Sequence, residues 1–266
     1  MKKIESVLDF PNNIWGEDRV FFYEKIAGVI DGSTPIDALE TKGYHSQASW
    51  LADKLKEQVS DKSDFNVVES FYEVINNYHK DNDILKLKTE NRPSAVMASI
   101  EEKDDKIILS IIGDCTAVVY FIDNRIKIFS DKRIRVFSQK TKDAKLRALA
   151  SGNNVKDAVN TQMKENRKYM NVENGFWTIA FKNDFRKEVK KYEINKADVY
   201  KVLLFTDGFE RIFTLSEVSL KQIFEEKVSL KSCIKILRNI ENQLESSQNS
   251  EVKKQDDAAA ILIQLN

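Results

Sequence analysis

The chain has 266 residues, of which 42% are hydrophobic, so a substantial core is available and we expect one domain over residues 1–266. Lysine plus arginine and aspartate plus glutamate both number 42, which leaves no excess positive charge to bind nucleic acid or an anionic membrane. The two cysteines form no C-x-x-C pair, and neither a signal-peptide segment nor an apolar run of membrane-spanning length is evident. These features predict a cytoplasmic protein without a disulfide framework or a membrane partner.

The first half of the chain contains both strand and helix patterns. Residues 20–24 and 26–31 are rich in β-branched and aromatic residues, which predicts two short strands. Apolar residues recur at helical spacing over 48–59 and 65–78, which predicts two amphipathic helices. The apolar runs within 94–130 are separated by short polar turns, so we expect three or four antiparallel strands joined by hairpins.

The second half repeats this mixture. Helical spacing returns over 142–168, through Leu146, Leu149 and Met163, with a helix stop at the "SGNN" segment. Further strands are predicted at 175–181, 199–207 and 258–265, and further helices at 215–226 and 229–247. Strict strand–helix–strand alternation is absent, which disfavours a doubly wound parallel sheet. The pattern predicts an α+β fold in which helices cover the faces of antiparallel sheets.

Acidic residues stand at the ends of several apolar runs, most clearly in "KVLLFTDGFERIF" at 201–213. Asp-Gly is a common turn dipeptide, so a single example would indicate only a turn. Here the arrangement recurs at Asp31, Asp114, Asp207 and the Asp256–Asp257 pair. Mg²⁺ and Mn²⁺ prefer carboxylate ligands, and a strand fixes the backbone that carries them. The sequence therefore predicts a site for hard divalent cations.

Two such ions can share a water molecule and generate hydroxide from it. This chemistry needs no side-chain nucleophile, and the chain offers no convincing one. Cys115 has no histidine near it in sequence and is better interpreted as a small strand residue. We therefore assign no side chain the role of nucleophile.

Five segments in chain order resemble the acidic signatures of the protein phosphatase 2C family of metal-dependent Ser/Thr phosphatases: "GEDRVFF", "GVIDGST", "IIGDCTAVVY", "LLFTDGFERI" and "DDAAAILI". The match extends from Glu17 to Leu265, and "NRKYMNVENGFWTI" resembles a bacterial branch of the family. The resemblance implies an α+β, four-layer αββα sandwich of two antiparallel sheets flanked by helices. It also implies hydrolysis of phosphoserine and phosphothreonine in proteins by hydroxide held on two Mg²⁺ or Mn²⁺ ions, with a Ser/Thr kinase as a further partner.

The resemblance also implies which residues bind the metals. Asp31 bridges both ions, the carbonyl of Gly32 binds one, and the acidic pair holds metal or its waters. The full set is Glu17, Asp18, Asp31, Gly32, Asp207 and Asp256, with Asp114 at a weaker third metal site.

The chain departs from the family pattern at several places, and two of these departures bear on the candidate site residues. The family often has an arginine before the acidic pair to hold the substrate phosphate, whereas this chain has Asn12 and Asn13 there. Arg19 is the nearest arginine and our candidate for this role, with a solvent-facing strand residue as the alternative. Asp257 replaces a common asparagine and competes with Asp256 as the ligand. The missing arginine also leaves open a phosphatase-like binding or regulatory module with weak or no turnover.

Overall fold

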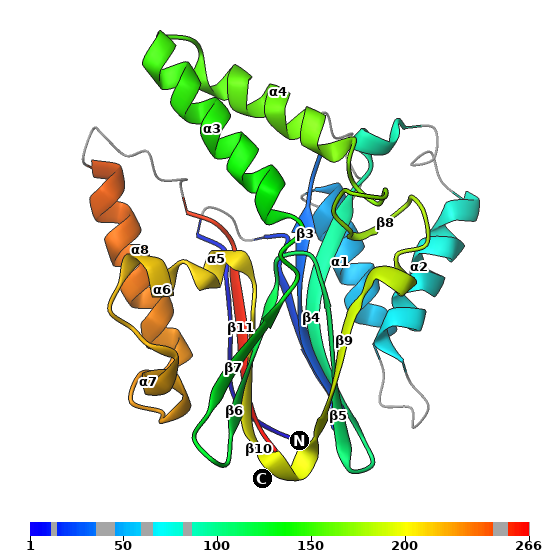
Figure 1. The fold of residues 1–266 in the computed structure, drawn as a ribbon, viewed down its shortest axis with the longest axis vertical. Helices are drawn as coiled ribbons and strands as arrows, with labels where there is room; N and C mark the ends of the chain where they lie inside the picture. Colours follow the sequence, from blue (N-terminus) through cyan, green and yellow to red (C-terminus); the bar gives the residue numbers. More distant parts are fainter. Residues whose placement is uncertain (12–14, 36–45, 60–65, 82–86, 247–254, 266) are drawn as a thin grey trace.

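The strands form two sheets. The structure is a computed structural model that describes residues 1–11, 15–35, 46–59, 66–81, 87–246 and 255–265. The first sheet has the order β1 (Lys2–Asp9), β11 (Ala258–Gln264), β10 (Val199–Phe205), β6 (Thr116–Phe121) and β7 (Ile126–Ser130). The second has the order β2 (Arg19–Phe22), β3 (Ile26–Ser33), β4 (Ser94–Lys103), β5 (Lys106–Ile112) and β9 (Lys190–Asn195), and β8 (Ile179–Ala180) pairs with β4. The pairs within both sheets are antiparallel, and the sheets face each other (Figure 1).

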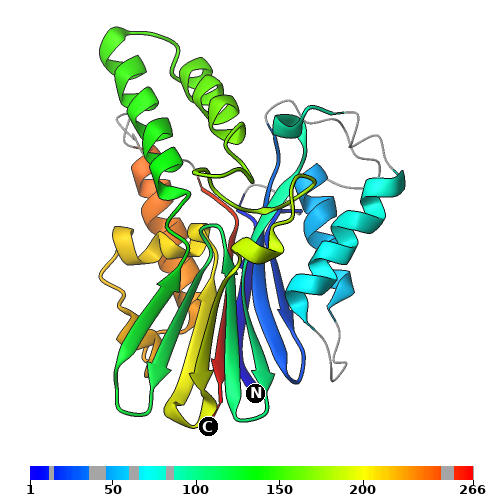
Figure 2. The ribbon, with the colours of Figure 1, turned by 45° about the vertical axis from the view of Figure 1, so that its right-hand side comes forward.

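Helices cover the outer faces of both sheets. Those on the second sheet are α1 (Gln47–Gln58) and α2 (Val67–Asp81). Those on the first sheet are α5 (Asp207–Glu210), α6 (Ile212–Leu215), α7 (Leu220–Phe224) and α8 (Leu230–Ser246). Short 3₁₀ turns are η2 (Thr89–Asn91), η3 (Arg186–Glu188) and η4 (Lys196–Asp198). The four-layer α+β sandwich implied by the sequence resemblance is confirmed (Figures 1 and 2).

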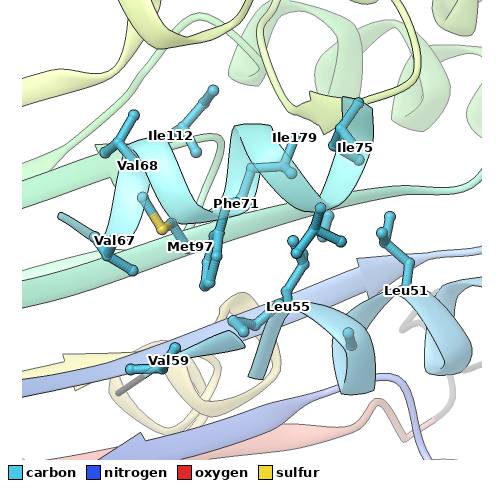
Figure 3. Close-up of a cluster of buried hydrophobic side chains, with 14 of the residues drawn as sticks. Leu51, Leu55, Val59, Val67, Val68, Phe71, Ile75, Met97, Ile112 and Ile179 are labelled. Atoms are coloured by element: carbon cyan, nitrogen blue, oxygen red, sulfur yellow. The ribbon is translucent and has the colours of Figure 1, made fainter. Parts of the chain in front are cut away.

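The alternation of side chains along each strand creates separate cores on the two faces of a sheet. Along β10, Val202 and Leu204 face the other sheet, whereas Leu203 and Phe205 face the helices. Both faces of β10 are therefore buried, which explains why its sequence is a continuous run of apolar residues. On the opposite side of the molecule, Phe71 of α2 points toward the second sheet in the helix-covered core (Figure 3).

The remaining two helices, α3 (Arg135–Ser151) and α4 (Val155–Arg167), form a hairpin that projects beyond the sheets (Figures 1 and 2). The predicted stop at "SGNN" is confirmed, because Gly152 ends α3 with a φ of 69° and the Asn154 side chain caps α4. Unlike the other helices, α3 and α4 do not cover a sheet face. Leu146, Leu149 and Met163 are 48%, 47% and 40% exposed, since the hairpin packs mainly on itself.

Three further differences concern strands. The edge strands β1 and β9 were not predicted, and the segment 175–181 contributes only the two-residue strand β8. The Asn171 side chain explains the short β8: its amide donates to the carbonyls of Thr178 and Lys182, and its carbonyl accepts from the Thr178 amide. These bonds hold the segment as a compact loop. Among the described residues, no helix has both the length and the apolar character needed to cross a bilayer.

Candidate metal centre

The antiparallel register brings the acidic strand ends to one end of the sandwich. Phe205, at the end of β10, pairs with Thr116 at the start of β6 and with Ala260 near the start of β11. Asp207, Asp114 and Asp256 lie just beyond these paired positions, and Asp31 of β3 pairs with Val96 of β4 in the facing sheet. A cleft of about 320 Å³ opens there, and the carboxylates that line it are Glu17, Asp31, Asp114, Asp207 and Asp256.

Two glycines permit the close backbone packing behind this cleft. Gly113 has a φ of 78°, and a Cβ there would lie 2.0 Å from a Val96 methyl, so the chain can cross between the sheets only with glycine. A Cβ on Gly208 would lie 1.8 Å from the carbonyl oxygen of Asp257. The Asp-Gly dipeptide at 207–208 is therefore not a simple turn. It begins α5, and the absence of a side chain on Gly208 allows the backbone of Asp257 to pack against it.

Burial and mutual repulsion disfavour the ionised forms of two of the aspartates. Asp18 is only 2% exposed beneath the cleft, and burial raises its pKa well above the usual range, with further contributions from Asp207, Asp257 and Asp256. Burial likewise raises the pKa of Asp31, and the charges of Asp18 and Asp207 are the next largest causes. A bound cation would reverse both effects, because it stabilises carboxylates in their charged form.

The loop that carries the acidic pair is held by specific hydrogen bonds. Glu17 accepts from the hydroxyls of Thr34 and Ser46, both at 2.5 Å, and its backbone carbonyl accepts from the Gly32 amide at 3.2 Å. Asp18 accepts from the Thr206 hydroxyl at 2.7 Å. The acidic pair is thereby fixed against both the Asp31–Gly32 segment and the end of β10.

Asp256 and Asp257 have different surroundings. Asp256 lines the cleft, and its backbone carbonyl accepts from Arg238 of α8 at 2.7 Å. Asp257 is not among the lining residues, and its Oδ2 accepts from the backbone amide of Glu17 at 2.6 Å. Asp256 therefore faces the cleft, whereas Asp257 holds the acidic loop in position.

Arg19 is buried rather than solvent-facing, and it does not line the cleft. Its guanidinium pairs with both carboxylate oxygens of Asp53 in α1, at 2.5 and 2.9 Å. It also donates to the backbone carbonyls of Gly16 and Asp18, both at 2.7 Å, and to the Ser49 hydroxyl at 3.0 Å. This arrangement fixes the acidic loop and does not favour a role in holding phosphate. Asn12 and Asn13 lie outside the described residues.

Sequence reasoning missed the arginine that does line the cleft. Arg167, at the end of α4, is 8% exposed and donates to the Ser33 hydroxyl at 2.8 Å, the Ser33 carbonyl at 3.0 Å and the Arg92 carbonyl at 3.1 Å. Burial lowers its pKa to about 10, with a smaller opposing contribution from Glu17. Arg167 lies within the "NRKYMNVENGFWTI" segment, but nothing in its local sequence distinguishes it from a solvated helix residue.

The donor set fits Mg²⁺ or Mn²⁺ better than softer metals, because the cleft offers carboxylate oxygens and no thiolate or imidazole among its lining residues. In the described parts of the chain, no three acidic, histidine or cysteine side chains are gathered tightly enough to chelate an ion as they stand. Binding would therefore have to draw the carboxylates together. Cys115 is buried, and burial raises its thiol pKa well above the usual value, which leaves it unreactive.

Sequence comparison finds no matching family model and no matching curated protein. Solved structures do match the fold. The serine/threonine phosphatase PstP/Ppp of Mycobacterium tuberculosis aligns with a TM-score of 0.57 at 11% identity, over 98% of this chain and 97% of that one. Serine/threonine phosphatase Stp1 of Staphylococcus aureus aligns with a TM-score of 0.54 at 11% identity, over 100% and 96%. The catalytic domain of PstP in complex with two manganese ions gives 0.51 at 11% identity, over 97% and 95%. The chain therefore has the fold of bacterial protein phosphatase 2C-type Ser/Thr phosphatases, as its sequence resemblance implied.

Proposed function

We propose that this chain is a divalent-metal-dependent phosphatase that hydrolyses phosphoserine and phosphothreonine monoesters in proteins. The observation that carries the proposal is the convergence of five carboxylates from separate strand ends and loops in one cleft, with a buried arginine beside them. The fold shared with PstP and Stp1 supports the reaction class, and the manganese complex of PstP supports the metal. Residues 1–266 would act as one unit.

Two Mg²⁺ or Mn²⁺ ions, when bound, supply the Lewis acidity that activates water for in-line attack on phosphorus. Asp31 and the Gly32 carbonyl would hold ions from β3, and Asp207 and Asp256 would do so from the first sheet. Glu17 and Asp18 complete the proposed set, and Asp114 would serve a third, weaker site. The protein substrate would be supplied by a Ser/Thr kinase, whose reaction makes these phosphomonoesters.

The test measures hydrolysis of an aryl phosphate and a phosphothreonine peptide with Mn²⁺, with Mg²⁺ and with chelator. Metal-dependent release of phosphate, with preference for the peptide, is the expected result. If the protein binds the phosphopeptide in the presence of metal but releases no phosphate, it is a binding or regulatory module instead. If it neither binds nor hydrolyses either compound, the proposal fails.

A further inference from the structure

Arg167 is buried without a carboxylate partner among the described residues, unlike four other arginines of the chain. Arg19 pairs with Asp53, and Arg133 pairs with Asp131. Arg211 and Arg238 both pair with Glu241 of α8. Arg167 is 8% exposed, yet its described hydrogen bonds go only to two backbone carbonyls and one hydroxyl. A buried charge paired only with neutral groups is costly, so its position needs a reason.

The hydrogen bonds of Arg167 hold its guanidinium beside the acidic strand ends. Two of them go to Ser33, two residues after Asp31, and the third goes to Arg92, just before β4. A guanidinium has five N–H donors, so these three bonds leave donors for a ligand. Because Arg167 and the carboxylates line the same cleft, those donors are within reach of a molecule bound there.

A simpler interpretation is that Arg167 only offsets the negative charge of the carboxylates. That interpretation holds for the metal-free protein, where Glu17 favours the charged form of Arg167. With two divalent ions bound, however, the carboxylates are largely neutralised, and Arg167 would again lack a counterion. A phosphate dianion restores the balance, since it carries negative charge and can accept from the Nε and Nη1 hydrogens that the described bonds leave.

We propose that Arg167 binds the substrate phosphate, from the α4 side of the cleft, in this chain. The inference rests on the proposed function for its substrate class, and it replaces Arg19 as the candidate. The guanidinium comes from the α3–α4 hairpin and the carboxylates come from the sheets. The phosphate would therefore lie between two sides of the cleft that are formed by different elements. Arg167 contacts the substrate in this assignment, so it would affect phosphate affinity more than metal affinity.

The test uses the full chain loaded with Mg²⁺ and inorganic phosphate as the probe, measured by calorimetry. Arg167→Gln is expected to weaken phosphate affinity by about 10- to 100-fold, the range of a charge-assisted hydrogen bond. Arg167→Lys should give an intermediate loss, because an ammonium keeps the charge but cannot bond to Ser33, the Arg92 carbonyl and phosphate in the same fixed geometry. Lys168→Gln is the matched control: it removes the next positive charge, which is exposed and paired with Glu165, and should leave phosphate affinity unchanged.

Metal affinity and hydrolysis, measured on the same samples, separate this inference from the proposed function. Unchanged phosphate affinity in folded, metal-loaded Arg167→Gln overturns the inference, as does a wild-type chain that binds no phosphate at millimolar concentrations. If only metal affinity changes, the charge-balancing interpretation is correct. If phosphate binding depends on Arg167 but the chain has no hydrolytic activity, the inference is supported and the proposed function is wrong. If Arg167→Gln hydrolyses the substrate with an unchanged KM, the proposed function is supported and the inference is wrong.

Discussion

The two walls of the cleft are built in different ways. The acidic wall consists of strand ends such as Asp31, whose backbones are fixed by hydrogen bonds in two sheets. The basic wall is the base of the α3–α4 hairpin, which projects from the body and buries few side chains, among them Phe137 and Arg167 (Figure 1). A fixed backbone suits metal ligands, because only their side chains then have to rearrange when an ion draws the carboxylates together. The hairpin brings a cation to the opposite side of the cleft from a separate part of the chain.

The largest effect is expected from the acidic wall. Asp207→Asn should lower metal-dependent hydrolysis by at least about 100-fold, because the amide is nearly isosteric but a poor ligand for a hard cation. The fold should be retained, since Asp207 begins α5 at the cleft and not in the core. Initial rates with Mn²⁺ and far-ultraviolet circular dichroism would check both parts. Full activity in the variant would mean that Asp207 is not a metal ligand and that the Asp-Gly dipeptide has only a structural role.

Adjacent residues at the start of β11 provide a matched comparison within the same wall. Asp256→Asn should cause a loss similar to that of Asp207→Asn, because Asp256 lines the cleft. Asp257→Asn should cost less than about 10-fold, since the asparagine carbonyl can still accept the hydrogen bond from the Glu17 amide. Rates measured side by side decide the assignment. The reverse order of effects would exchange the roles of the two aspartates.

Metal binding should also stabilise the acidic wall. A metal concentration of 100 times Kd contributes about 2.7 kcal/mol, which corresponds to a rise in Tm of roughly 5–10 °C for a chain of this size. Thermal melts with and without Mn²⁺ measure the shift, with Asp207→Asn as the variant that should lose most of it. An unchanged Tm in the wild-type chain at millimolar Mn²⁺ would contradict a metal site.

The acidic wall could be predicted from sequence because its local causes are visible there. A strand buried on both faces gives a continuous apolar run, and an aspartate at its end stands out, as at Leu204 to Asp207. The helices that pack on the sheets were also predictable, since Leu51 and Leu55 recur on one face. The edge strands were not, because β9 alternates between exposed and half-buried residues and is dominated by polar side chains.

The basic wall could not be predicted, for a physical reason. An arginine on an amphipathic helix is usually solvated, and only the tertiary placement of α4 against Ser33 buries Arg167. Arg19 shows the opposite failure. It is adjacent to the acidic pair in sequence, but its side chain points into the α1 interface, where Asp53 pairs with it. Proximity to the acidic pair along the chain therefore does not indicate which arginine lines the cleft.

A substitution at Arg19 separates its structural role from the phosphate-binding role proposed for Arg167. Arg19→Lys should reduce stability by about 1–3 kcal/mol, because lysine cannot reproduce the bidentate pair with Asp53 and the bonds to Gly16 and Asp18. Phosphate affinity of the metal-loaded variant should stay close to that of the wild type. Denaturant melts and phosphate calorimetry measure the two properties. A large rise in phosphate Kd without loss of stability would return the phosphate role to Arg19.

The smallest effect is expected at Glu101, a half-buried carboxylate near the end of β4 that lies away from the cleft, which Ser94 lines at the other end of the strand. Burial raises its pKa from 4.5 to about 7, with opposing contributions from a backbone hydrogen bond to Val67 and the charges of Lys191 and Lys103. Between these two values the folded chain holds more protons at this site than the unfolded chain, so its contribution to stability falls as pH rises. Glu101→Gln should remove this decline and make the chain about 1–2 kcal/mol more stable at pH 8. Urea melts of both proteins at pH 5 and pH 8 measure the pH dependence of the free energy of unfolding.

Because Glu101 is remote from the cleft, the rise in Tm caused by Mn²⁺ should be the same in this variant. If the rise in Tm caused by Mn²⁺ differs in this variant, the stabilisation by metal does not depend only on the carboxylates at the cleft. Buried carboxylates elsewhere in the sheets would then contribute to it.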